Sequence, residues 1–261
     1  MADGPGLAVV TGAGRGIGAA IGIGLAEEGW SLVLTDACAG QSGIAYKMPT
    51  VADLEGVAER CARAGAPAVD VLQADVGVDN FVPGLVDALS GRTAGAAVAA
   101  AGVIAGGPGW ATSPEAWSTV MEVNFHGARR LAEATVPAMI EAGQGRFVGI
   151  ASAAALRAMP QLAAYSAAKA AVVGYVRALA ADLAGTGVSA NAICPGSTRG
   201  AMLTASLALY GLEDEEVFGR QQLMRRLLEP SEVAAAVVWL CGPRGSALTG
   251  AVVPVDGGLS P

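Results

Sequence analysis

Short apolar runs alternate along the chain with segments in which apolar residues recur every three or four positions. The apolar runs are 7–11, 31–35, 69–72, 96–101, 146–151 and 188–194. Helical spacing or a capping signal marks 16–29, 50–64, 79–89, the stretch after Ser113, and 165–184. Largely apolar runs that are each separated by a helix are typical of a parallel sheet buried on both faces. The pattern therefore predicts an α/β fold.

Two of the predicted helices have clear start signals. Thr50 and Asp53 stand at the N-cap and third positions of the helix expected over 50–64, which is the spacing of a capping box. Ser113 precedes Pro114, and proline is favoured at the first position of a helix. No low-complexity linker or internal repeat interrupts the alternation, so we predict one doubly wound domain over residues 1–261.

The composition argues against disorder and against a membrane span. Of the 261 residues, 53% are hydrophobic and 15% are charged, a balance that favours a folded core. The longest uncharged stretch, 93–114, is broken by glycines and a proline before it reaches the roughly 20 apolar residues of a spanning helix. The first residues carry no basic segment and no long apolar run, so a cytoplasmic protein is expected.

Charge and cysteine usage narrow the possible ligands. The net charge is −7, and we interpret the pairs Arg129–Arg130 and Arg225–Arg226 as solvated helix faces, so no nucleic-acid partner is expected. The 4 cysteines are far apart in the sequence and His126 is the single histidine. This usage predicts neither a metal site nor a disulfide framework.

A glycine-rich turn, Thr11-Gly12-Ala13-Gly14-Arg15-Gly16-Ile17-Gly18, follows the first apolar run. Glycines let the backbone approach a pyrophosphate, and the N-terminus of the next helix supplies free N–H groups. Asp36 ends the second run about 20 residues later, where a carboxylate accepts hydrogen bonds from the adenosine ribose. Its charge would repel a 2′-phosphate and so favours NAD over NADP, although Arg15 offsets part of that repulsion. The alternative is that Asp36 only caps a loop.

Further candidate side chains stand on or after later elements. Asp75 follows the third run and is placed to accept a hydrogen bond from an adenine amino group, or is an ordinary strand-end aspartate. Tyr165 and Lys169 are four residues apart and share one helix face. A nearby cation lowers the pKa of a phenol, which suits Tyr165 to acid/base chemistry; a chance pair on an amphipathic helix is the alternative. Ser152 follows the fifth run, at the sheet edge where ligands of such folds bind.

The chain resembles the short-chain dehydrogenase/reductase family over residues 7–258. The resemblance is carried by four motifs in this order: the glycine turn, Asn124, Ser152 and Tyr165-x-x-x-Lys169. The resemblance implies a single doubly wound Rossmann-type domain with a parallel seven-stranded sheet flanked by helices, and NAD(H) as cofactor. It implies that Tyr165 is the general acid/base, that Lys169 lowers its pKa and binds the nicotinamide ribose, and that Ser152 holds the substrate oxygen. Asn124 would hold a water that links Lys169 to solvent, or would satisfy helix backbone at a kink.

The resemblance also names the residues that would line the cofactor. They are Gly12, Arg15, Gly16, Ile17, Gly18, Asp36, Asp75, Val76, Ala101, Gly102, Tyr165, Lys169, Pro195, Gly196 and Thr198. Two places depart from the family. Ala99 and Ala100 replace the asparagine pair of many members, which removes polar links between strands. Gly200 stands where a threonine is usual, so Thr198 is assigned to the carboxamide from its nearness alone.

The connection after Asp36 contains an irregular insertion near 37–50 and is longer than such a connection requires. Together with 195–198 and 101–107, the insertion resembles the actinobacterial subgroup called mycofactocin-coupled. Members of that subgroup are thought to keep NAD bound and to reoxidise it through a peptide-derived redox cofactor. We hypothesise that the insertion is a lid that slows NAD exchange; a surface insertion is the alternative.

The expected substrate site lies above Ser152 and Tyr165, beside a substrate loop near 197–226. Its predicted wall consists of Val103, Ile104, Trp110, Leu156, Met159, Leu162 and 202–212. An apolar wall favours a hydrophobic secondary alcohol or ketone, such as a terpenoid. The family further implies a homotetramer, with one interface formed by the helices after Ser113 and around Tyr165. Two alternatives stay open, namely a reductase with freely exchanging NAD(P)H and a non-catalytic dinucleotide-binding sensor.

Overall fold

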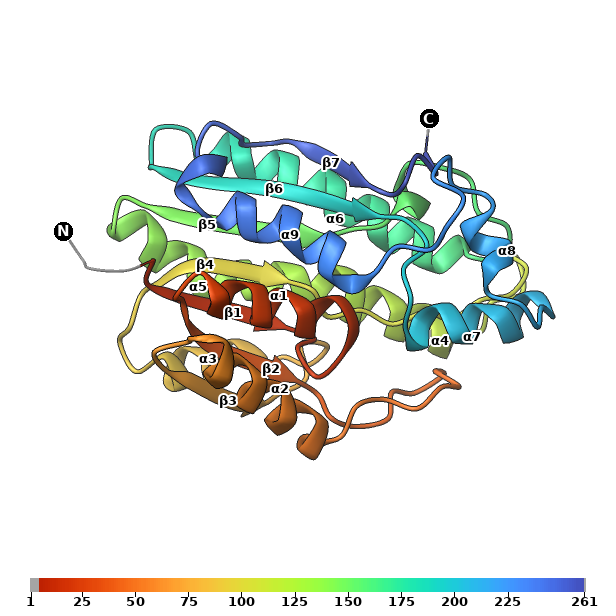
Figure 1. Cartoon of the computed structure of the whole chain (residues 1–261), viewed down its shortest axis with the longest axis horizontal. Coiled ribbons are helices and arrows are strands. Elements are labelled where there is room, and N and C mark those ends of the chain that lie inside the picture. Colours follow the sequence, from red (N-terminus) through yellow and green to blue (C-terminus); the bar gives the residue numbers. More distant parts are fainter. Residues whose placement is uncertain (1–4, 261) are drawn as a thin grey trace.

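The computed structural model describes residues 5–260 and contains a parallel sheet of seven strands in the order β3-β2-β1-β4-β5-β6-β7 (Figure 1). The strands are β1 Leu7–Thr11, β2 Ser31–Asp36, β3 Val69–Gln73, β4 Ala94–Ala99, β5 Gly145–Ile150, β6 Val188–Pro195 and β7 Val252–Val255. This arrangement confirms the predicted doubly wound α/β fold. Because β1 lies between β2 and β4, the chain reverses its direction of travel across the sheet there and opens a crevice at the strand ends.

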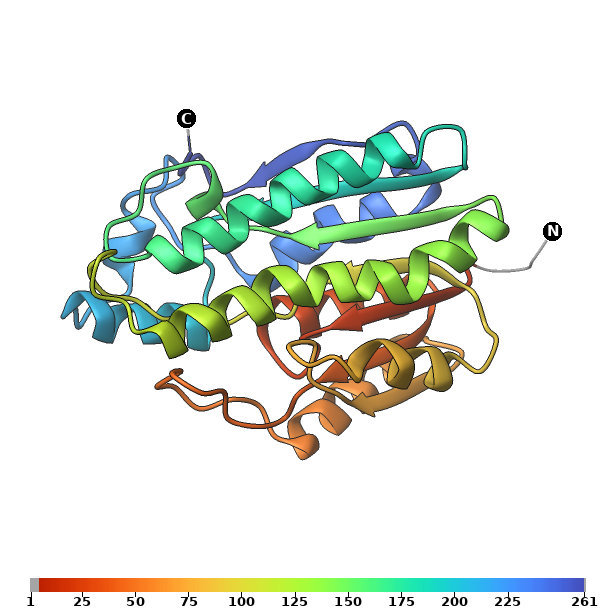
Figure 2. The same ribbon diagram turned by 180° about the vertical axis from the view of Figure 1, so that it is seen from behind.

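Helices cover both faces of the sheet (Figures 1 and 2). One face carries α1 Gly16–Glu27, α2 Val51–Ala64 and α9 Pro230–Cys241, and the other carries α3 Phe81–Leu89, α5 Gly127–Glu141 and α6 Ala163–Asp182. Adjacent residues of β1 pack against the helices on opposite faces of the sheet, since Val9 belongs to one apolar cluster and Val10 to the other. Both are fully buried, which is why the strands read as continuous apolar runs.

Three further helices lie beyond the carboxyl ends of the strands. They are α4 Pro114–Met121, α7 Ala201–Tyr210 and α8 Glu216–Gly219. A π-helical turn, Glu122–His126, joins α4 to α5. Ser113 accepts a hydrogen bond from the Ala116 N–H at 3.2 Å and so caps α4 as predicted. The predicted Thr50–Asp53 capping box is likewise present at the start of α2.

Several boundaries differ from the prediction. The first helix ends at Glu27 and not at Gly29, and β4 spans 94–99 where 96–101 was predicted. The shift leaves Ala101 and Gly102 in the loop after β4. The Thr11 hydroxyl accepts hydrogen bonds from the N–H groups of Ala100 and Ala101, each at 3.1 Å, so backbone donors link this segment to β1 where Ala99 and Ala100 offer no polar side chain.

The interpretation of Arg130 as part of a solvated helix face is wrong. Its side chain is 8% exposed and donates to Glu122 and Asp79, each at 2.9 Å, and to the Val76 carbonyl at 3.1 Å. Burial of the cation is tolerated because each bond has a carboxylate or carbonyl acceptor. Arg225 and Arg226 also lie outside any helix of residues 5–260.

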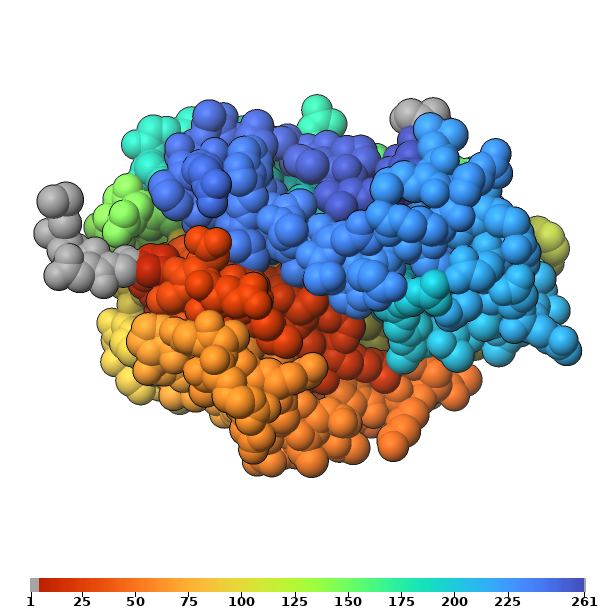
Figure 3. Space-filling view, in the orientation of Figure 1, coloured from red at the N-terminus to blue at the C-terminus, as the bar shows by residue number. Residues whose placement is uncertain are grey.

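The insertion near 37–50 has neither helix nor strand, and we call it the strap (residues 37–50). It leaves β2 and passes beneath α4 and α7 before α2 begins (Figures 1 and 2). The Ser42 hydroxyl donates to Glu115 on α4, and a Cβ on Gly43 would lie 2.9 Å from the Ala116 Cα. The strap is therefore packed against the body of the protein. In Figure 3 it lies below the segment that contains α7.

No helix in the part of the chain from 5 to 260 is long and apolar enough to cross a membrane. Over the same residues, no group of three or more His, Cys, Asp or Glu side chains is placed to hold a metal ion.

Candidate active site

The glycine turn brings the start of α1 close to the end of β4. A Cβ on Gly12 would lie 2.6 Å from the Ala101 Cα, and one on Gly18 would lie 2.1 Å from the Gly12 carbonyl oxygen. Gly12 and Gly16 also have positive φ angles of 65° and 56°, which glycine adopts without strain. No side chain caps the N-terminus of α1, so its first N–H groups are available to an anionic ligand.

Asp36 organises this turn and also faces the crevice. Its side chain accepts hydrogen bonds from the Gly14 N–H at 3.0 Å and from the Cys38 N–H at 3.2 Å. The residue is 8% exposed and lines the cavity described below. A carboxylate has about four acceptor positions, so the two backbone donors leave capacity for ribose hydroxyls. The two proposed roles of Asp36, loop cap and cofactor ligand, are compatible.

Asp75 and Val76 lie across the crevice from the glycine turn. Asp75 accepts hydrogen bonds from the Gly77 N–H at 2.7 Å and from the Gln41 amide of the strap at 2.8 Å. Both residues line the cavity. The Gln41 contact was not predicted, and it joins the strap to the wall of the expected adenine site.

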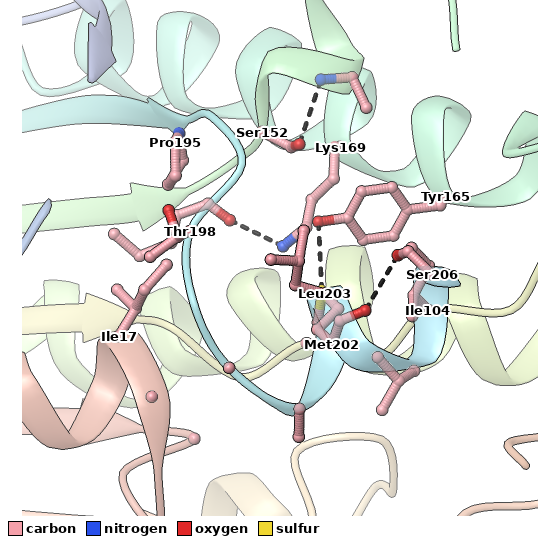
Figure 4. Close-up of a pocket in the computed structure, with 18 of the residues that line it drawn as sticks. Ile17, Ile104, Ser152, Tyr165, Lys169, Pro195, Thr198, Met202, Leu203 and Ser206 are labelled. Atoms are coloured by element: carbon pink, nitrogen blue, oxygen red, sulfur yellow. Dashed lines mark hydrogen bonds between the residues drawn. The ribbon is translucent and has the colours of Figure 1, made fainter. Parts of the chain in front are cut away.

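Ser152, Tyr165 and Lys169 converge at the carboxyl end of the sheet (Figure 4). Ser152 follows β5, whereas the other two lie one turn apart on α6. The Lys169 ammonium donates to the Ile150 carbonyl at 2.8 Å and stands 5.7 Å from the centre of the Tyr165 ring. The Tyr165 hydroxyl donates to the Met202 sulfur at 3.7 Å. The three predicted catalytic side chains therefore share one buried site.

Burial is the largest cause of the pKa shifts of Tyr165 and Lys169. Burial raises the pKa of Tyr165 to about 12, although a hydrogen bond with Ser152 works in the opposite direction. Burial also lowers the pKa of Lys169 to about 8. The loss of hydration outweighs the effect of the neighbouring groups, so the pKa of Tyr165 lies above its ordinary value, and the lowering of that pKa by Lys169 stays a prediction. At neutral pH the phenol is protonated.

Asn124 lies in the π-helical turn, and its amide is only half satisfied. The amide nitrogen donates to the carbonyls of Val103 and Val120, each at 2.8 Å. Its side-chain oxygen is buried and has no hydrogen-bond partner within residues 5–260. A Cβ on Gly102 would lie 2.8 Å from this oxygen and 3.3 Å from the Lys169 nitrogen. The unused acceptor of Asn124 and the Lys169 ammonium therefore both lie next to Gly102.

The loop after β6 forms the remaining wall. Pro195, Gly196 and Thr198 line the cavity, and the Thr198 hydroxyl donates to the Gly196 carbonyl at 3.1 Å. A Cβ on Gly196 would lie 2.3 Å from the side-chain oxygen of Gln222, which accepts a hydrogen bond from the Ser197 N–H at 2.9 Å. Gln222 is fully buried. Sequence reasoning missed this glutamine, since no spacing rule links it to the loop.

One cavity of about 710 Å³ connects the glycine turn with Ser152, Tyr165 and Lys169, whereas Asn124 and Gln222 do not line it. It is lined by every predicted cofactor residue and by Ser152. At its other end, it is bounded by Val103, Ile104, Met159, Leu162, Met202 and Leu203. Trp110 and Leu156 were wrongly predicted for this wall, because their side chains turn to solvent and are 92% and 40% exposed.

The strap contributes wall residues that the sequence did not reveal. Tyr46 lines the cavity, and its hydroxyl accepts a hydrogen bond from the Ile104 N–H at 3.1 Å. The Arg15 guanidinium lies 5.5 Å from the centre of the Tyr46 ring and donates to the Lys47 carbonyl at 2.5 Å. The one signal in the sequence was an aromatic residue within an otherwise irregular insertion.

Comparison with known proteins identifies the family. The family model described as enoyl-(acyl carrier protein) reductase matches residues 12–260. An NAD-dependent oxidoreductase of Mycobacterium tuberculosis is 35% identical over 261 residues, covering 97% of this chain and 94% of that protein. The 2-(S)-hydroxypropyl-CoM dehydrogenase 3 of Xanthobacter autotrophicus is 31% identical over 255 residues, covering 96% and 95%.

Solved structures give the same assignment. Carveol dehydrogenase from Mycobacterium avium in complex with NAD has a TM-score of 0.92 at 25% identity and covers 98% of both chains. A short chain dehydrogenase from Mycobacterium paratuberculosis bound to NAD has a TM-score of 0.88 at 26% identity, with 98% of both chains covered. The chain belongs to the short-chain dehydrogenase/reductase family.

Proposed function

We propose that this protein, an NAD-dependent short-chain dehydrogenase/reductase, interconverts a hydrophobic secondary alcohol and its ketone by hydride transfer. The observation that carries the proposal is the convergence of Ser152, Tyr165 and Lys169 in one cavity with the glycine turn. The NAD-dependent relative and the two NAD-bound structural neighbours support the choice of cofactor. A purely dinucleotide-binding sensor would not require this buried acid/base group.

The residues at the crevice fit NAD. At Gly12 and Gly18 a Cβ would clash with the protein's own backbone, so glycine is required for this tight turn. The N-terminus of α1 offers its N–H groups to the pyrophosphate. Asp36 would bind the adenosine ribose and Asp75 with Val76 the adenine. Ala101 and Gly102 would line the middle of the cofactor. Bound NAD supplies the hydride acceptor for alcohol oxidation and, as NADH, the hydride donor for ketone reduction.

At the nicotinamide end, Lys169 would bind the ribose, and Pro195, Gly196 and Thr198 would form the loop around the ring. The buried, unsatisfied oxygen of Asn124 supports a role in holding a water between Lys169 and solvent. These assignments explain why polar atoms that lack partners in the protein are retained in a buried site.

The protein's own groups would move the proton. In ketone reduction, the Tyr165 hydroxyl gives its proton to the substrate oxygen, while the Ser152 hydroxyl donates a hydrogen bond to that oxygen and stabilises its developing charge. In alcohol oxidation, Tyr165 takes the proton back. With a pKa of about 12, Tyr165 is held ready as a proton donor at neutral pH.

The apolar end of the cavity supports a hydrophobic substrate. Val103, Ile104, Met159 and Leu162 face this space, which favours a hydrocarbon skeleton over a sugar. The printed name of the Mycobacterium avium neighbour, carveol dehydrogenase, supports a terpenoid alcohol.

We further propose that residues 1–261 form one domain, in which 197–226 is the substrate loop and the strap is a lid over the cofactor. Gln41 holds the lid at Asp75, and Tyr46 holds it at Ile104. A lid fixed at these two points would slow NAD exchange, and the retained NAD would then be reoxidised in place by an external acceptor such as mycofactocin. A homotetramer is proposed as well, and the 39% exposed Trp117 on α4 supports an interface there.

The test begins with protein purified without added cofactor. Absorbance and mass spectrometry would detect retained NAD(H), and a hydrophobic alcohol with a dye acceptor would then report turnover. Stoichiometric NAD that is reduced in place supports the lidded enzyme. Empty protein that turns over with added NAD removes the lid proposal, and retained NAD that no alcohol or ketone alters contradicts the enzyme proposal.

Tyr46 offers a sharper test of the lid. Tyr46→Phe removes the acceptor of the Ile104 N–H, and the loss of about 1 kcal/mol corresponds to NAD dissociation roughly five times faster. Tyr175→Phe is the matched control, since Tyr175 lies on α6 and does not line the cavity. Equal NAD dissociation rates in the two variants would contradict the lid.

A further inference from the structure

Met202 makes a contact that the proposed chemistry does not require. It lies in the first turn of α7, and its sulfur accepts the hydrogen bond of the Tyr165 hydroxyl at 3.7 Å (Figure 4). The thioether sulfur is a weak acceptor compared with an alcohol or ketone oxygen. The group that must donate a proton to substrate is therefore engaged with a poor partner from the substrate loop.

The backbone that carries Met202 is fastened to the body of the protein. At the other end of α7, the Tyr210 hydroxyl donates to the Pro160 carbonyl at 2.7 Å. Leu209 packs so closely that a Cβ on Gly106 would lie 2.2 Å from one of its methyl carbons. The Ser206 hydroxyl, which is buried, donates to the Met202 carbonyl at 2.9 Å. The first two contacts hold α7 against the body of the protein and the third lies within the helix, so a rearrangement at Met202 needs to involve only its side chain.

The phenol has a single proton, so Met202 and the substrate oxygen compete for it. A substrate oxygen must approach to roughly 2.6–3.2 Å of the Tyr165 oxygen for proton transfer. Donation to that oxygen requires the bond to sulfur to break. An unbranched side chain with three rotatable bonds can swing aside without movement of its helix.

Building on the proposed function, we propose that Met202 is a specificity-determining gate that occupies the hydrogen-bonding position of the substrate oxygen until a substrate displaces it. Leu203 and Ile104 line the same part of the cavity, so the displaced thioether would pack with them against the carbon skeleton of the substrate. A bulky apolar substrate gains this contact. A small substrate must displace the thioether and gains little in return.

The gate predicts a split between small and bulky ketones. In Met202→Ala, KM for a small ketone such as cyclohexanone should fall about fivefold, because no displacement is needed, while KM for a bulky terpenoid ketone should rise. In Met202→Leu, a branched side chain with one rotatable bond fewer has fewer ways to move aside, and KM should rise about fivefold for both ketones. Met224→Ala is the matched control, because Met224 is 54% exposed and does not line the cavity.

A readout independent of turnover comes from methionine methyl groups labelled with ¹³C. The chain has 7 methionines, and loss of one NMR signal in Met202→Leu identifies the Met202 methyl. Adding the terpenoid ketone to the NADH-loaded protein should shift this signal and leave that of Met224 unchanged. A Met202 signal that does not move while the ketone is reduced would overturn the gate and leave the proposed function standing. A signal that moves on ketone binding without any hydride transfer would support the gate and contradict the proposed function.

Discussion

Replacing Lys169 with methionine is expected to stabilise the cofactor-free protein at neutral pH, even though it removes a residue proposed for the cofactor site. Lys169 is 3% exposed, and its hydrogen-bond acceptor is the Ile150 carbonyl. Among residues 5–260, no carboxylate forms a salt bridge with it. A buried cation without a counter-charge lowers stability.

The magnitude follows from the pKa of Lys169, which burial lowers from 10.5 to about 8. At about 1.4 kcal/mol per pKa unit, the protonated lysine costs about 3 kcal/mol of stability below pH 8. Methionine removes this cost and forfeits the bond to Ile150, which is worth about 1 kcal/mol. The net gain in unfolding free energy should be about 2 kcal/mol at pH 7.

The sign of the pH dependence distinguishes this cause from simple repacking. Between pH 8 and 10.5 the unfolded chain binds more protons at Lys169 than the folded protein, so wild-type stability gains from this group as pH rises. The variant lacks that gain. Its advantage over wild type, about 2 kcal/mol at pH 7, should therefore be lost by pH 10. Buried cysteines such as Cys194, whose pKa burial raises to about 11, act in both proteins and cancel in the difference.

Urea unfolding at fixed protein concentration, followed by tryptophan fluorescence at pH 7, 8, 9 and 10, measures the difference. Lys47→Met provides the control, because Lys47 is exposed and its side chain forms no hydrogen bond in the described part of the chain. A stability difference for Lys169→Met that stays constant with pH would refute the reasoning. So would a variant less stable than wild type at pH 7.

Three further changes test the site. Tyr165→Phe should lower ketone reduction by at least about 100-fold and leave the Kd for NAD within threefold, because it removes only the proton donor; unchanged turnover would contradict the assignment. Asp36→Asn should reduce the preference for NAD over NADP at least about tenfold, measured as the ratio of Kd values, since it removes the charge that repels a 2′-phosphate. Gly18→Ala should abolish NAD binding, because its Cβ would lie 2.1 Å from the Gly12 carbonyl oxygen. Gly84→Ala is the control: nothing lies within 4 Å of the added Cβ, and the variant should raise the free energy of unfolding by about 1 kcal/mol. Equal NAD affinity in the two glycine variants would show that the close packing at Gly18 does not shape the site.

Apolar runs and capping residues, both local features of the sequence, predicted most of the strands and the starts of two helices. The strands β1, β2, β4, β5 and β6 read as apolar runs because they are buried on both faces, whereas the edge strand β3 is only partly buried. The caps at Thr50 and Ser113 depend on residues only three positions away. The last strand is short and contains Pro254. Neither it nor α7 was predicted from the hydrophobic pattern, since neither presents a clear apolar face.

In the candidate site, too, local sequence patterns predicted some residues and missed those brought together by long-range contacts. The glycine turn and the Tyr165–Lys169 pair come from spacings within one element or one turn. The Tyr46–Ile104 bond joins residues 58 positions apart, and the Tyr165–Met202 contact joins residues 37 apart. Such contacts depend on how loops fold over the sheet, which no local pattern records. The outward turn of Trp110 was missed for the same reason.

The most direct test of the account is the transfer of deuterium from NADH labelled at C4 to a hydrophobic ketone. The alcohol product would be analysed by mass spectrometry, with Tyr165→Phe run in parallel. The account predicts one deuterium at the carbinol carbon with the wild-type protein, and at least about 100-fold less labelled product with the variant. Unlabelled ketone recovered across a panel of apolar ketones, from protein that binds NADH, would contradict it.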